Sequence, residues 1–517
     1  MKVLLIDTGT TRREYSEPIG VETLVSYITN ADVDVMSLEL QGYEAVITNI
    51  RNHFYGVIGI SSKIGSFDII KELVAQITLI SPDSVICIGD IYGTYAYQDI
   101  LKWNSKVICM IGEGEKNLPM LVDAVAQHGQ EYRKYLHNIK SIAYFNQDIQ
   151  INDRESVMDV KQARFPSRVL LNDVLKKNGI AHLEGSRGCL YGKCSFCGIA
   201  QKYGNPKWRP FDEEFIYKEL IHLSNAGVVS PYFTDEDFFG NDVERVIRIA
   251  HGIISLKQKE LISPKLNFYF NMRVDSVVGN GIGGYQKARE ALEILQRAGL
   301  REVFIGIESG SSEQIARYKK NNEQNKSIKA IMTLNSLSID VDIGFILFDP
   351  YMSINDLANN LDFIHQAGIS TNYSRLAKKL RVEPLTPFKE ECQNSINISE
   401  QLDMETVSYP YTFVDNKVAR VYEVFSKWER EDLDFIYNLQ SFCRGEVPCE
   451  EDRNKVKKII SMYRSLDLSL LRKLCDFEIN GSSGTYENII NYFYNIRNQY
   501  DVAMKETIED YMKEYRS

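Results

Sequence analysis

The sequence lacks an apolar run long enough to cross a membrane, and it lacks the features of a secretory signal. A membrane-spanning helix needs about 20 predominantly apolar residues in succession, and the sequence contains no such run. In the opening stretch MKVLLIDTGTTRREY, the short apolar run is followed at once by Asp7, Arg12 and Arg13, where a cleavage region would stand. We therefore expect a cytoplasmic protein without a membrane partner.

The sequence also lacks an excess of basic charge. It has 60 lysines and arginines against 70 aspartates and glutamates, which gives a formal net charge of −10. Proteins that bind nucleic acids usually carry a basic face, so we expect no nucleic-acid partner, although a local basic cleft stays possible. With 517 residues, 44% of them hydrophobic, the chain has enough apolar mass for two or three cores.

Cysteine is scarce, with nine residues in the whole chain. Disulfides are improbable in a reducing cytoplasm. Cys87 and Cys109 lie in apolar runs and are expected to be buried thiols. Four others are scattered without a pair at metal-ligand spacing: Cys392, Cys443, Cys449 and Cys475. Only the trio in EGSRGCLYGKCSFCGIA needs a chemical explanation, and its members are Cys189, Cys194 and Cys197.

The chain has no fixed-period repeat, but residues 1–140 alternate short apolar runs with helical patterns. This alternation predicts an α/β domain with a doubly wound, Rossmann-like parallel sheet. The expected strands are residues 2–8, 33–40, 56–62, 84–90 and 106–114. Such a sheet binds ligands beyond the carboxyl ends of its strands. The small or acidic residues at those ends are Ser61, Ser62, Gly89, Asp90 and Gly112 to Glu115.

A polar connector, residues 141–178, leads to a second alternating series over residues 179–394. Six strands are expected there, at residues 180–186, 230–237, 266–272, 302–309, 341–349 and, less clearly, 374–382. Six strand–helix units are too few for a closed eight-unit barrel, so the pattern predicts a partial (β/α)6 barrel. From residue 395 to 517 strand signals fade, and tyrosine-rich, charged helical stretches predict a mainly helical third domain.

The three close cysteines point to a metal centre with an open position. Thiolates bind zinc and iron–sulfur clusters. Structural zinc would need a fourth ligand, and the nearest histidine is His182 in the preceding strand. A trio that holds three irons of a [4Fe–4S] cluster leaves the fourth iron open for an external ligand. Because the trio follows the first barrel strand, where loops carry chemistry, the cluster is the favoured interpretation over zinc or inert thiols.

The run SRGCLYGKCSFCGI resembles the cluster motif of the radical S-adenosylmethionine superfamily, with Phe196 before the last cysteine. The commonest motif has three residues between its first two cysteines, whereas this chain has four, Leu190 to Lys193. The resemblance implies that the three cysteines hold a [4Fe–4S] cluster and that S-adenosylmethionine binds its open iron.

The resemblance continues along the barrel and implies further S-adenosylmethionine contacts. The segments that carry it are YFTDEDFFGN, NMRVD, VFIGIESGS and VDIGFILFDP, each at a strand end. The residues implied are Phe196, Asp235, Glu236, Arg273, Glu308, Ser309 and the stretch from Gly344 to Ile346. In LRVEPLTPF, Leu385 stands where relatives often have the glycine of a proline-glycine-threonine turn. Taken singly, these segments read as ordinary helix caps and turns, and their order at successive strand ends favours the cofactor interpretation.

The first domain resembles the cobalamin-binding domain of the cobalamin-dependent radical class. This resemblance implies corrinoid contacts at Ser61, Ser62, Gly89, Gly112 and Glu113. The loop DTGTTRRE has Gly9 where many corrinoid proteins place a histidine that binds cobalt from below. The radical class commonly lacks this histidine, so its absence agrees with that class. The alternative is a domain that keeps the fold without binding a corrinoid.

The resemblance implies a radical enzyme whose cofactors carry the reaction while the protein orients them. The leading hypothesis is a cobalamin-dependent methyltransferase that acts on carbon in a peptide or other natural-product intermediate. One alternative is a related enzyme that forms a ring, rearranges or oxidises its substrate without net methylation. Another is a non-catalytic corrinoid- or metal-binding regulator. A one-electron donor such as flavodoxin or ferredoxin is the expected protein partner.

Overall fold

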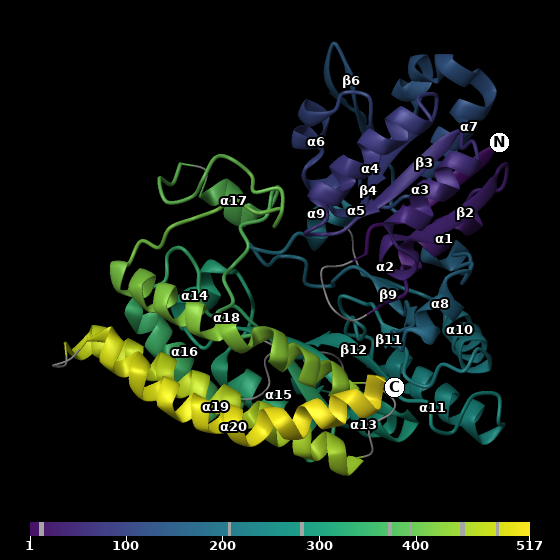
Figure 1. Ribbon diagram of the computed structural model, residues 1–517. Helices are drawn as coiled ribbons and strands as arrows, with labels where there is room; N and C mark the ends of the chain where they lie inside the picture. The colour runs from purple at the N-terminus through teal and green to yellow at the C-terminus, as the bar shows by residue number, and fades with distance from the viewer. Residues whose placement is uncertain are drawn as a thin grey trace.

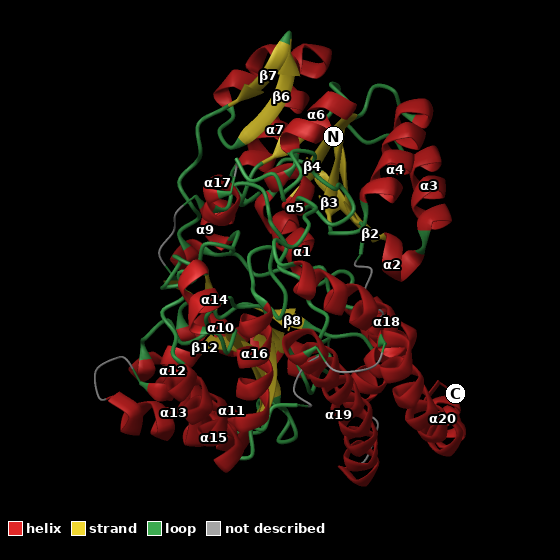
Figure 2. Ribbon diagram, turned by 90° about the vertical axis from the view of Figure 1, so that its left-hand side faces the viewer, coloured by secondary structure: helices red, strands yellow, loops and turns green. Residues whose placement is uncertain are grey.

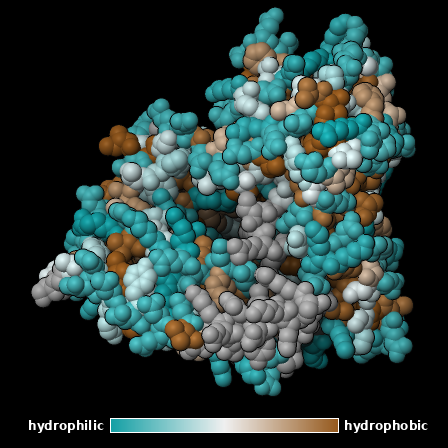
Figure 3. All heavy atoms as spheres, viewed as in Figure 1, coloured by the Kyte–Doolittle hydropathy of each residue, from teal (hydrophilic) through white to brown (hydrophobic). Residues whose placement is uncertain are grey.

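The computed structural model describes residues 1–516 except 10–14, 205–207, 280–283, 371–374, 393, 445–449 and 482–484. Figure 1 shows an amino-terminal sheet domain, a second sheet with its helices below it, and a bundle of long carboxyl-terminal helices. The face seen in Figure 3 is largely hydrophilic, with hydrophobic residues scattered over it. Among the described helices, none is both long and apolar enough to cross a membrane.

The amino-terminal domain is a doubly wound sheet in the strand order β2-β1-β3-β4-β5-β6-β7. Its parallel strands are β1 (Lys2–Asp7), β2 (Asp32–Ser37), β3 (Val57–Ser62), β4 (Val85–Gly89) and β5 (Ile108–Met110). The helices around them are α1 (Ile19–Tyr27), α2 (Leu38–Gln41), α3 (Tyr43–Asn52), α4 (Phe67–Ile80), α5 (Asp90–Tyr95), α6 (Tyr97–Trp103) and α7 (Asn117–His128), followed by the 3-10 segment η1 (Gly129–Asn138). One apolar core lies on each face of the sheet, which explains why the central strands read as continuous apolar runs.

The sheet has two more strands than the five expected from the sequence. β6 (Ile142–Asn146) pairs antiparallel with β5, and β7 (Asp148–Ile151) pairs antiparallel with β6 at the edge of the sheet. A single residue, Gln147 with φ +63°, turns the chain between them. Figure 2 shows this hairpin projecting from the domain. The sequence pattern indicates only a connector here, because an exposed edge hairpin carries polar residues and lacks a strong apolar pattern.

The second unit is an open sheet in the order β14-β13-β12-β11-β8, with all strands parallel. The strands are β8 (His182–Leu183), β11 (Tyr232–Phe233), β12 (Phe268–Arg273), β13 (Leu300–Glu308) and β14 (Asp340–Phe345). The expected sixth strand contributes an isolated parallel bridge between Phe348 and Lys379. A separate antiparallel pair, β9 (Ser186–Arg187) and β10 (Arg209–Pro210), lies beside the first strand.

Helices accompany the strands of this partial barrel, and several of them pack against one face of its sheet. Along β12 and β13 most side chains alternate between buried and partly exposed positions, so that one face meets the helices and the other lines the interior. The helices are α8 (Leu171–Lys176), α9 (Ile199–Tyr203), α10 (Glu213–Asn225), α11 (Val243–Gln258), α12 (Val274–Val278), α13 (Gly284–Ala298), α14 (Ser312–Arg317), α15 (Gln324–Ser336), α16 (Ile354–Gln366) and α17 (Pro387–Glu391), with η2 (Val160–Gln162) before them.

The third unit consists of three long helices, α18 (Asn416–Arg444), α19 (Glu450–Asn480) and α20 (Tyr486–Arg516). α19 packs against both of its neighbours and against α16 of the barrel. The fold class predicted from the sequence, a doubly wound sheet followed by a partial barrel and a helical part, is confirmed. The domain limits at residues 140, 178 and 394 stay a prediction.

Buried charges join the first unit to the second. The Arg168 guanidinium pairs with Glu17 of the first unit and with Glu219 of α10, and it also donates to the carbonyl of His182 at 2.6 Å. Glu22 of α1 accepts a hydrogen bond from the backbone N–H of Leu170 at 2.7 Å. Burial and the neighbouring Glu17 raise the pKa of Glu22 to about 9. Glu22 therefore carries a proton in the folded protein at neutral pH.

The proton on Glu22 makes a prediction for stability. The folded chain binds a proton at Glu22 that the unfolded chain releases above a pKa of 4.5, so stability falls as pH rises from about 4.5 toward 9. In Glu22→Gln the amide supplies the same donor at every pH. We expect the variant to gain on the order of 2 kcal/mol over the wild type at pH 8.5 and little at pH 5, measured by urea unfolding of the apo chain. Equal differences at both pH values would refute the protonation of Glu22 in the folded protein.

Candidate active site at the facing ends of two sheets

The three cysteines lie on one loop between β9 and α9, at the carboxyl end of the barrel sheet. All three are partly exposed, whereas Cys87, Cys109, Cys392 and Cys475 are buried as inert thiols would be. Cys449 lies outside the described residues. Ser195 anchors the loop, because its N–H donates to the carbonyl of Tyr318 at 2.9 Å and its carbonyl accepts from Phe388 at 2.8 Å.

The thiols need a partner to lose their protons. Burial raises the pKa of Cys194 to about 11 and that of Cys197 to about 12, and burial also raises the pKa of Cys189. A metal that binds thiolate displaces these protons. In the described part of the chain, no group of three or more His, Cys, Asp and Glu side chains is gathered to hold a single ion. Three thiols on one loop, each able to bind a separate iron, fit a cluster.

The longer spacing between the first two cysteines is accommodated by Tyr191. Its hydroxyl donates to the backbone carbonyl of Lys319, and the Arg273 guanidinium lies 5.0 Å from the centre of its ring. Arg273, at the end of β12, also pairs with Asp275 and stands 3.9 Å from the carboxylate of Asp237. Arg273 thus lies beside the cysteine loop, and its contact with S-adenosylmethionine stays a prediction.

The acidic segment after β11 contains two neighbouring carboxylates, Asp235 and Glu236, that contact different parts of the protein. Glu236 accepts hydrogen bonds from the N–H of Gly188 and from the hydroxyl of Tyr203, both at 2.9 Å, so it lies next to Cys189. Asp235 points the other way and is fully buried, where it accepts from the N–H of Gly185 at 2.8 Å and from the hydroxyl of Ser186. Burial raises the pKa of Asp235 to about 7. Its contacts are therefore with the loop backbone.

Glu308 forms an ion pair with Lys320 near the cysteine loop, and no sequence motif indicates this pair. The Glu308 carboxylate lies 2.8 Å from the Lys320 ammonium, and both side chains are largely buried. Burial alone would lower the pKa of Lys320, but Glu308 and the Cys194 thiol raise it overall. Ser309 instead turns into the interior, with its hydroxyl 2.6 Å from the side-chain oxygen of Gln314 and 2.8 Å from that of Asn360.

The other barrel residues predicted from the sequence, Ile346, Phe196 and Gly344, pack around the cysteine loop and the strand ends next to it. Ile346 donates its N–H to the carbonyl of Glu308 at 2.8 Å and lies in an apolar cluster with Phe196. The Phe196 ring packs edge-on against Tyr318 with 5.1 Å between ring centres. A Cβ on Gly344 would stand 2.7 Å from the Phe304 ring, so a larger residue there would require this ring to shift. Gly344 and Ile346 lie at the end of β14 and Phe196 lies in the cysteine loop, and their contact with S-adenosylmethionine stays a prediction.

On the first sheet, the predicted corrinoid residues gather at the carboxyl ends of β3 and β4. The Ser62 hydroxyl donates to the carbonyl of Gly89 and accepts from the N–H of Tyr92 at 3.0 Å, which fixes the start of α5. The Ser61 hydroxyl lies 3.4 Å from the carboxylate of Asp90, which pairs with Lys63. Nearby, the Oδ1 atom of Asp7 is buried without a hydrogen-bond partner. This polar edge is the place where a ligand of the sheet would sit.

Gly112 and Glu113 belong to the next loop, and they meet the second unit. Gly112 donates its N–H to the Thr94 hydroxyl at 3.1 Å and has φ +75°. Glu113 lies 3.0 Å from Arg187 and 2.8 Å from Arg209. Burial alone would raise the pKa of Glu113, but these two guanidinium groups lower it below its usual value. Glu113 is therefore an ionised residue of the contact between the two units.

Arg187 is the centre of that contact. It lies two residues before Cys189 and is 7% exposed. Its guanidinium pairs with Glu184 at 2.8 Å and with Glu113 and Glu115 of the first unit. A second bridge comes from Tyr95 at the end of α5, whose hydroxyl donates to the carbonyl of Gly198 at 2.7 Å. Both ends of the cysteine loop are thus held by the first domain.

Several non-glycine residues near the two sheet edges have positive φ: Lys319 (+49°), whose carbonyl contacts Tyr191 of the cysteine loop, Glu308 (+72°), Leu385 (+61°) and, at the edge of the first sheet, Asp90 (+62°). A left-handed conformation costs an L-residue roughly 1–2 kcal/mol, and such strain gathers at functional sites. Leu385 occupies the position where the resemblance has a glycine, and its positive φ explains why relatives favour glycine there.

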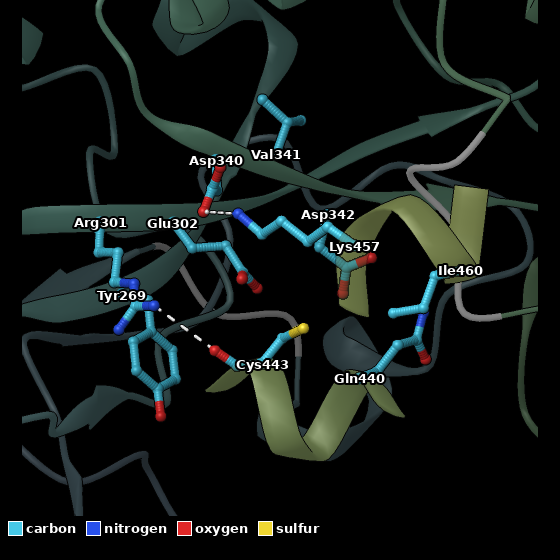
Figure 4. Close-up of a pocket in the computed structure, with 10 residues that line it drawn as sticks. All are labelled: Tyr269, Arg301, Glu302, Asp340, Val341, Asp342, Gln440, Cys443, Lys457 and Ile460. Carbon is cyan, nitrogen blue, oxygen red and sulfur yellow. Dashed lines mark hydrogen bonds and ion pairs between the residues drawn. The ribbon is translucent and has the colours of Figure 1, made fainter. Parts of the chain in front are cut away.

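A cavity of about 210 Å³ lies elsewhere, at the amino ends of β12, β13 and β14 under α18 and α19. Figure 4 shows Lys457 of α19 paired with Asp340 and Arg301 directed at the carbonyl of Cys443. Glu302 in this cavity and Glu308 beside the cysteines are six residues apart on one strand, which corresponds to roughly 20 Å. The cavity is therefore remote from the cysteine loop.

Comparison with known proteins agrees with this geometry. Residues 183–364 match the family model described as the Radical SAM superfamily. The chain is 25% identical over 593 aligned positions to 4'-phospho-dehydrooxetanocin synthase of Priestia megaterium, an alignment that covers 95% of this chain and 76% of that protein. It is 22% identical to the hopanoid C-3 methylase of Methylococcus capsulatus, over 65% of this chain and 61% of that protein.

Two solved structures share the fold. The cobalamin-dependent S-adenosylmethionine radical enzyme OxsB with aqua-cobalamin bound superposes with a TM-score of 0.82 and 22% identity, over 99% of this chain and 80% of that chain. The radical S-adenosylmethionine methyltransferase TsrM from Kitasatospora setae gives a TM-score of 0.65 and 13% identity, over 93% of this chain and 99% of that chain. The resemblance that the sequence indicates is confirmed: residues 183–364 match the radical SAM superfamily, and the chain shares the fold of two cobalamin-dependent or cobalamin-bound radical S-adenosylmethionine enzymes.

The buried position of Arg187 yields a prediction. Arg187→Gln would remove the cation that pairs with Glu115 and Glu184 and would leave Glu113 with Arg209 alone, and breaking a buried pair costs about 3–5 kcal/mol. We expect a loss of about 3 kcal/mol in urea unfolding of the apo chain. Arg248→Gln removes an exposed arginine paired with Glu213 at 2.7 Å, and as the control it should cost less than about 1 kcal/mol. Equal losses would show that Arg187 does not join the units.

Proposed function

Because residues 183–364 form a radical SAM domain, we propose that the protein is a cobalamin-dependent radical S-adenosylmethionine enzyme. Its reaction is methylation of carbon in a peptide or other natural-product intermediate. The observation that carries the proposal is the position of the cysteine loop. It lies at the carboxyl end of the barrel sheet and is held at both ends by the loop after β5 and by α5 of the first sheet.

The chain's own residues provide the places for the cofactors. Cys189, Cys194 and Cys197 hold the cluster, and Glu236, beside Cys189, is the carboxylate suited to meet the amino group of S-adenosylmethionine. Lys320 and Arg273 are the cations suited to meet its carboxylate. Both lie close enough to Cys194 for their charges to favour its thiolate form. When bound, the cluster and S-adenosylmethionine supply a radical able to abstract hydrogen from unactivated carbon, and a corrinoid supplies the methyl group.

In the proposal, the other predicted residues hold the surrounding chain in place and do not contact the reacting groups. Asp235, Ser309, Gly344, Ile346 and Phe196 position the backbone and strand ends that surround the cofactor. On the first sheet, Ser61, Ser62, Gly89 and Gly112 shape the corrinoid edge, while Glu113 ties that edge to Arg187. With Gly9 at the loop after β1, the chain offers no histidine there as the lower ligand of cobalt.

A non-methylating reaction is the second candidate. The relative that aligns with 95% of this chain is named a synthase, whereas the hopanoid relatives are named methylases. Ring formation or oxidation would use the same cofactor places. In both cases a one-electron donor such as flavodoxin or ferredoxin would reduce the cluster.

Anaerobic reconstitution with iron, sulfide and hydroxocobalamin tests the proposal. We expect about four irons per chain, a bound corrin, and formation of 5′-deoxyadenosine and S-adenosylhomocysteine after reduction. Cys197→Ala should lose the cluster and both products. Cys475→Ala is the matched control, because Cys475 of α19 is buried against the carbonyl of Ile354 of α16, away from the cysteine loop.

Each outcome selects between the candidates. A substrate product heavier by one methylene unit supports the methyltransferase. 5′-Deoxyadenosine without S-adenosylhomocysteine, with bound corrin, favours the non-methylating enzyme. A reconstituted cluster that cleaves no S-adenosylmethionine would refute the radical enzyme and support a regulator.

The role assigned to Lys320 makes a separate prediction. Lys320→Gln removes a buried charge suited to the cofactor carboxylate, and a charged hydrogen bond contributes roughly 1.5–3 kcal/mol. We expect at least about a tenfold rise in the Kd for S-adenosylmethionine with the iron content unchanged. Lys319→Gln is the control, because Lys319 is exposed and pairs with Glu391. An unchanged Kd in Lys320→Gln would remove Lys320 from the site.

A further inference from the structure

The cysteine loop has one edge that reaches solvent. Between residues 186 and 198 the exposed residues are Leu190, Gly192 and Lys193, and the others are buried or half-buried. Leu190 is 43% exposed. Leu190 and Lys193 are direct neighbours of the first two cysteines, and adjacent Cα atoms are about 3.8 Å apart. These three exposed residues, the loop edge, therefore lie next to two of the three cysteines.

The other parts of the loop are held against protein. Arg187 ties its first end to the first unit, and the Tyr95 hydroxyl of that unit donates to the carbonyl of Gly198 at its last end. In the middle, the Ser195 hydroxyl donates to the carbonyl of Arg317 at the end of α14 at 2.8 Å. Of the described residues of this loop, the loop edge is therefore the part where a partner protein comes nearest to the cysteines.

Tyr191 keeps the loop edge in one position. It stands between Leu190 and Gly192, its hydroxyl donates to the carbonyl of Lys319, and its ring centre lies 5.0 Å from the Arg273 guanidinium. Gly192 has φ +56°, a conformation that favours glycine. A surface that is already ordered loses little conformational entropy when a partner binds. The longer spacing between the first two cysteines is thus part of an ordered surface.

Around the loop edge, cations face solvent while the nearest carboxylates are buried. Lys193 is exposed, and the Lys319 side chain beside Tyr191 is 54% exposed, although it pairs with Glu391. The buried or largely buried carboxylates behind the loop are Asp237, Asp275 and Glu308. The chain as a whole has a net charge of −10. An acidic partner is therefore repelled by the chain as a whole and attracted at this edge.

We propose that the loop edge is the docking surface for an acidic one-electron carrier protein, and that Lys193 is the residue that attracts it. A flavodoxin hydroquinone docked there loses one electron, and the [4Fe–4S] cluster gains this electron and passes from its 2+ to its 1+ state. No bond forms or breaks in this step. The inference rests on the proposed function, because it needs a cluster held by the three cysteines.

Binding of oxidised flavodoxin to the full chain tests the docking surface independently of the cluster. The Kd is measured by isothermal titration calorimetry at low ionic strength. We expect it to rise about two- to fivefold in Lys193→Gln and at least about tenfold in Lys193→Glu, where like charges would face each other. Lys193→Arg keeps the charge and should keep the Kd of the wild type. At about 1 M salt, where the screening length is about 3 Å, the Kd values should converge.

Stopped-flow reduction of the reconstituted protein connects docking with electron transfer. Flavodoxin hydroquinone should reduce the cluster at least about tenfold more slowly in Lys193→Glu than in the wild type. Photoreduced 5-deazariboflavin, a small uncharged reductant, should reduce both proteins at the same rate. Lys259→Glu is the matched control, because Lys259 is an exposed lysine just after α11, where the chain returns to the start of β12. It makes the same change in net charge and should keep the wild-type Kd and rates.

Three results would overturn the inference and leave the proposed function intact. They are equal Kd values in the wild type and Lys193→Glu, equal losses in Lys193→Glu and Lys259→Glu, and a wild type that binds no flavodoxin. If Lys193→Glu holds less iron than the wild type, the comparison of Lys193→Gln with Lys193→Arg decides. A wild type that forms a cluster but cleaves no S-adenosylmethionine with photoreduced 5-deazariboflavin would instead overturn the proposed function, whatever its Kd for flavodoxin.

Discussion

The Arg187 guanidinium holds together carboxylates that come from two sheets, and the geometry of the site depends on it. Glu113 and Glu115 belong to the loop after β5 of the first sheet, while Glu184 follows β8 of the barrel. A buried ion pair contributes little net stability over an apolar contact, but it enforces one arrangement of its partners. Since Cys189 is two residues away, this arrangement also fixes where the cysteine loop begins.

Some of this structure can be read from the sequence because burial leaves a simple pattern. β1, β3 and β4 are covered on both faces, so they appear as short apolar runs between helical segments. The hairpin β6–β7 leaves no such pattern, because its exposed edge carries polar residues such as Asn146 and Asp148. The barrel strands β8 and β11, neighbours at one side of the sheet, have only two residues each in it. The cysteine motif after β8 and the acidic segment after β11 indicate these strands better than their own length does.

Some features of the candidate site can likewise be predicted from the sequence, whereas others need the structure. The cysteine trio is readable because its spacing is local in the sequence. Asp235 and Glu236 are neighbours with opposite directions, and only the fold shows that Glu236 meets the loop next to Cys189 while Asp235 is buried. Lys320 could not be found from the motifs, because it reaches the cysteine loop from a separate segment of the chain. The type of a residue indicates which chemistry it can perform, whereas its burial and the direction of its side chain show whether it lies at the site.

The central claim is that the edge of the first sheet and the cysteine loop face one another and hold two cofactors in one gap. Electron paramagnetic resonance of protein that contains both cob(II)alamin and the reduced cluster tests this claim most directly. We expect dipolar interaction between the two spins, which disappears in Cys197→Ala. A spectrum equal to the sum of two isolated centres would contradict the claim.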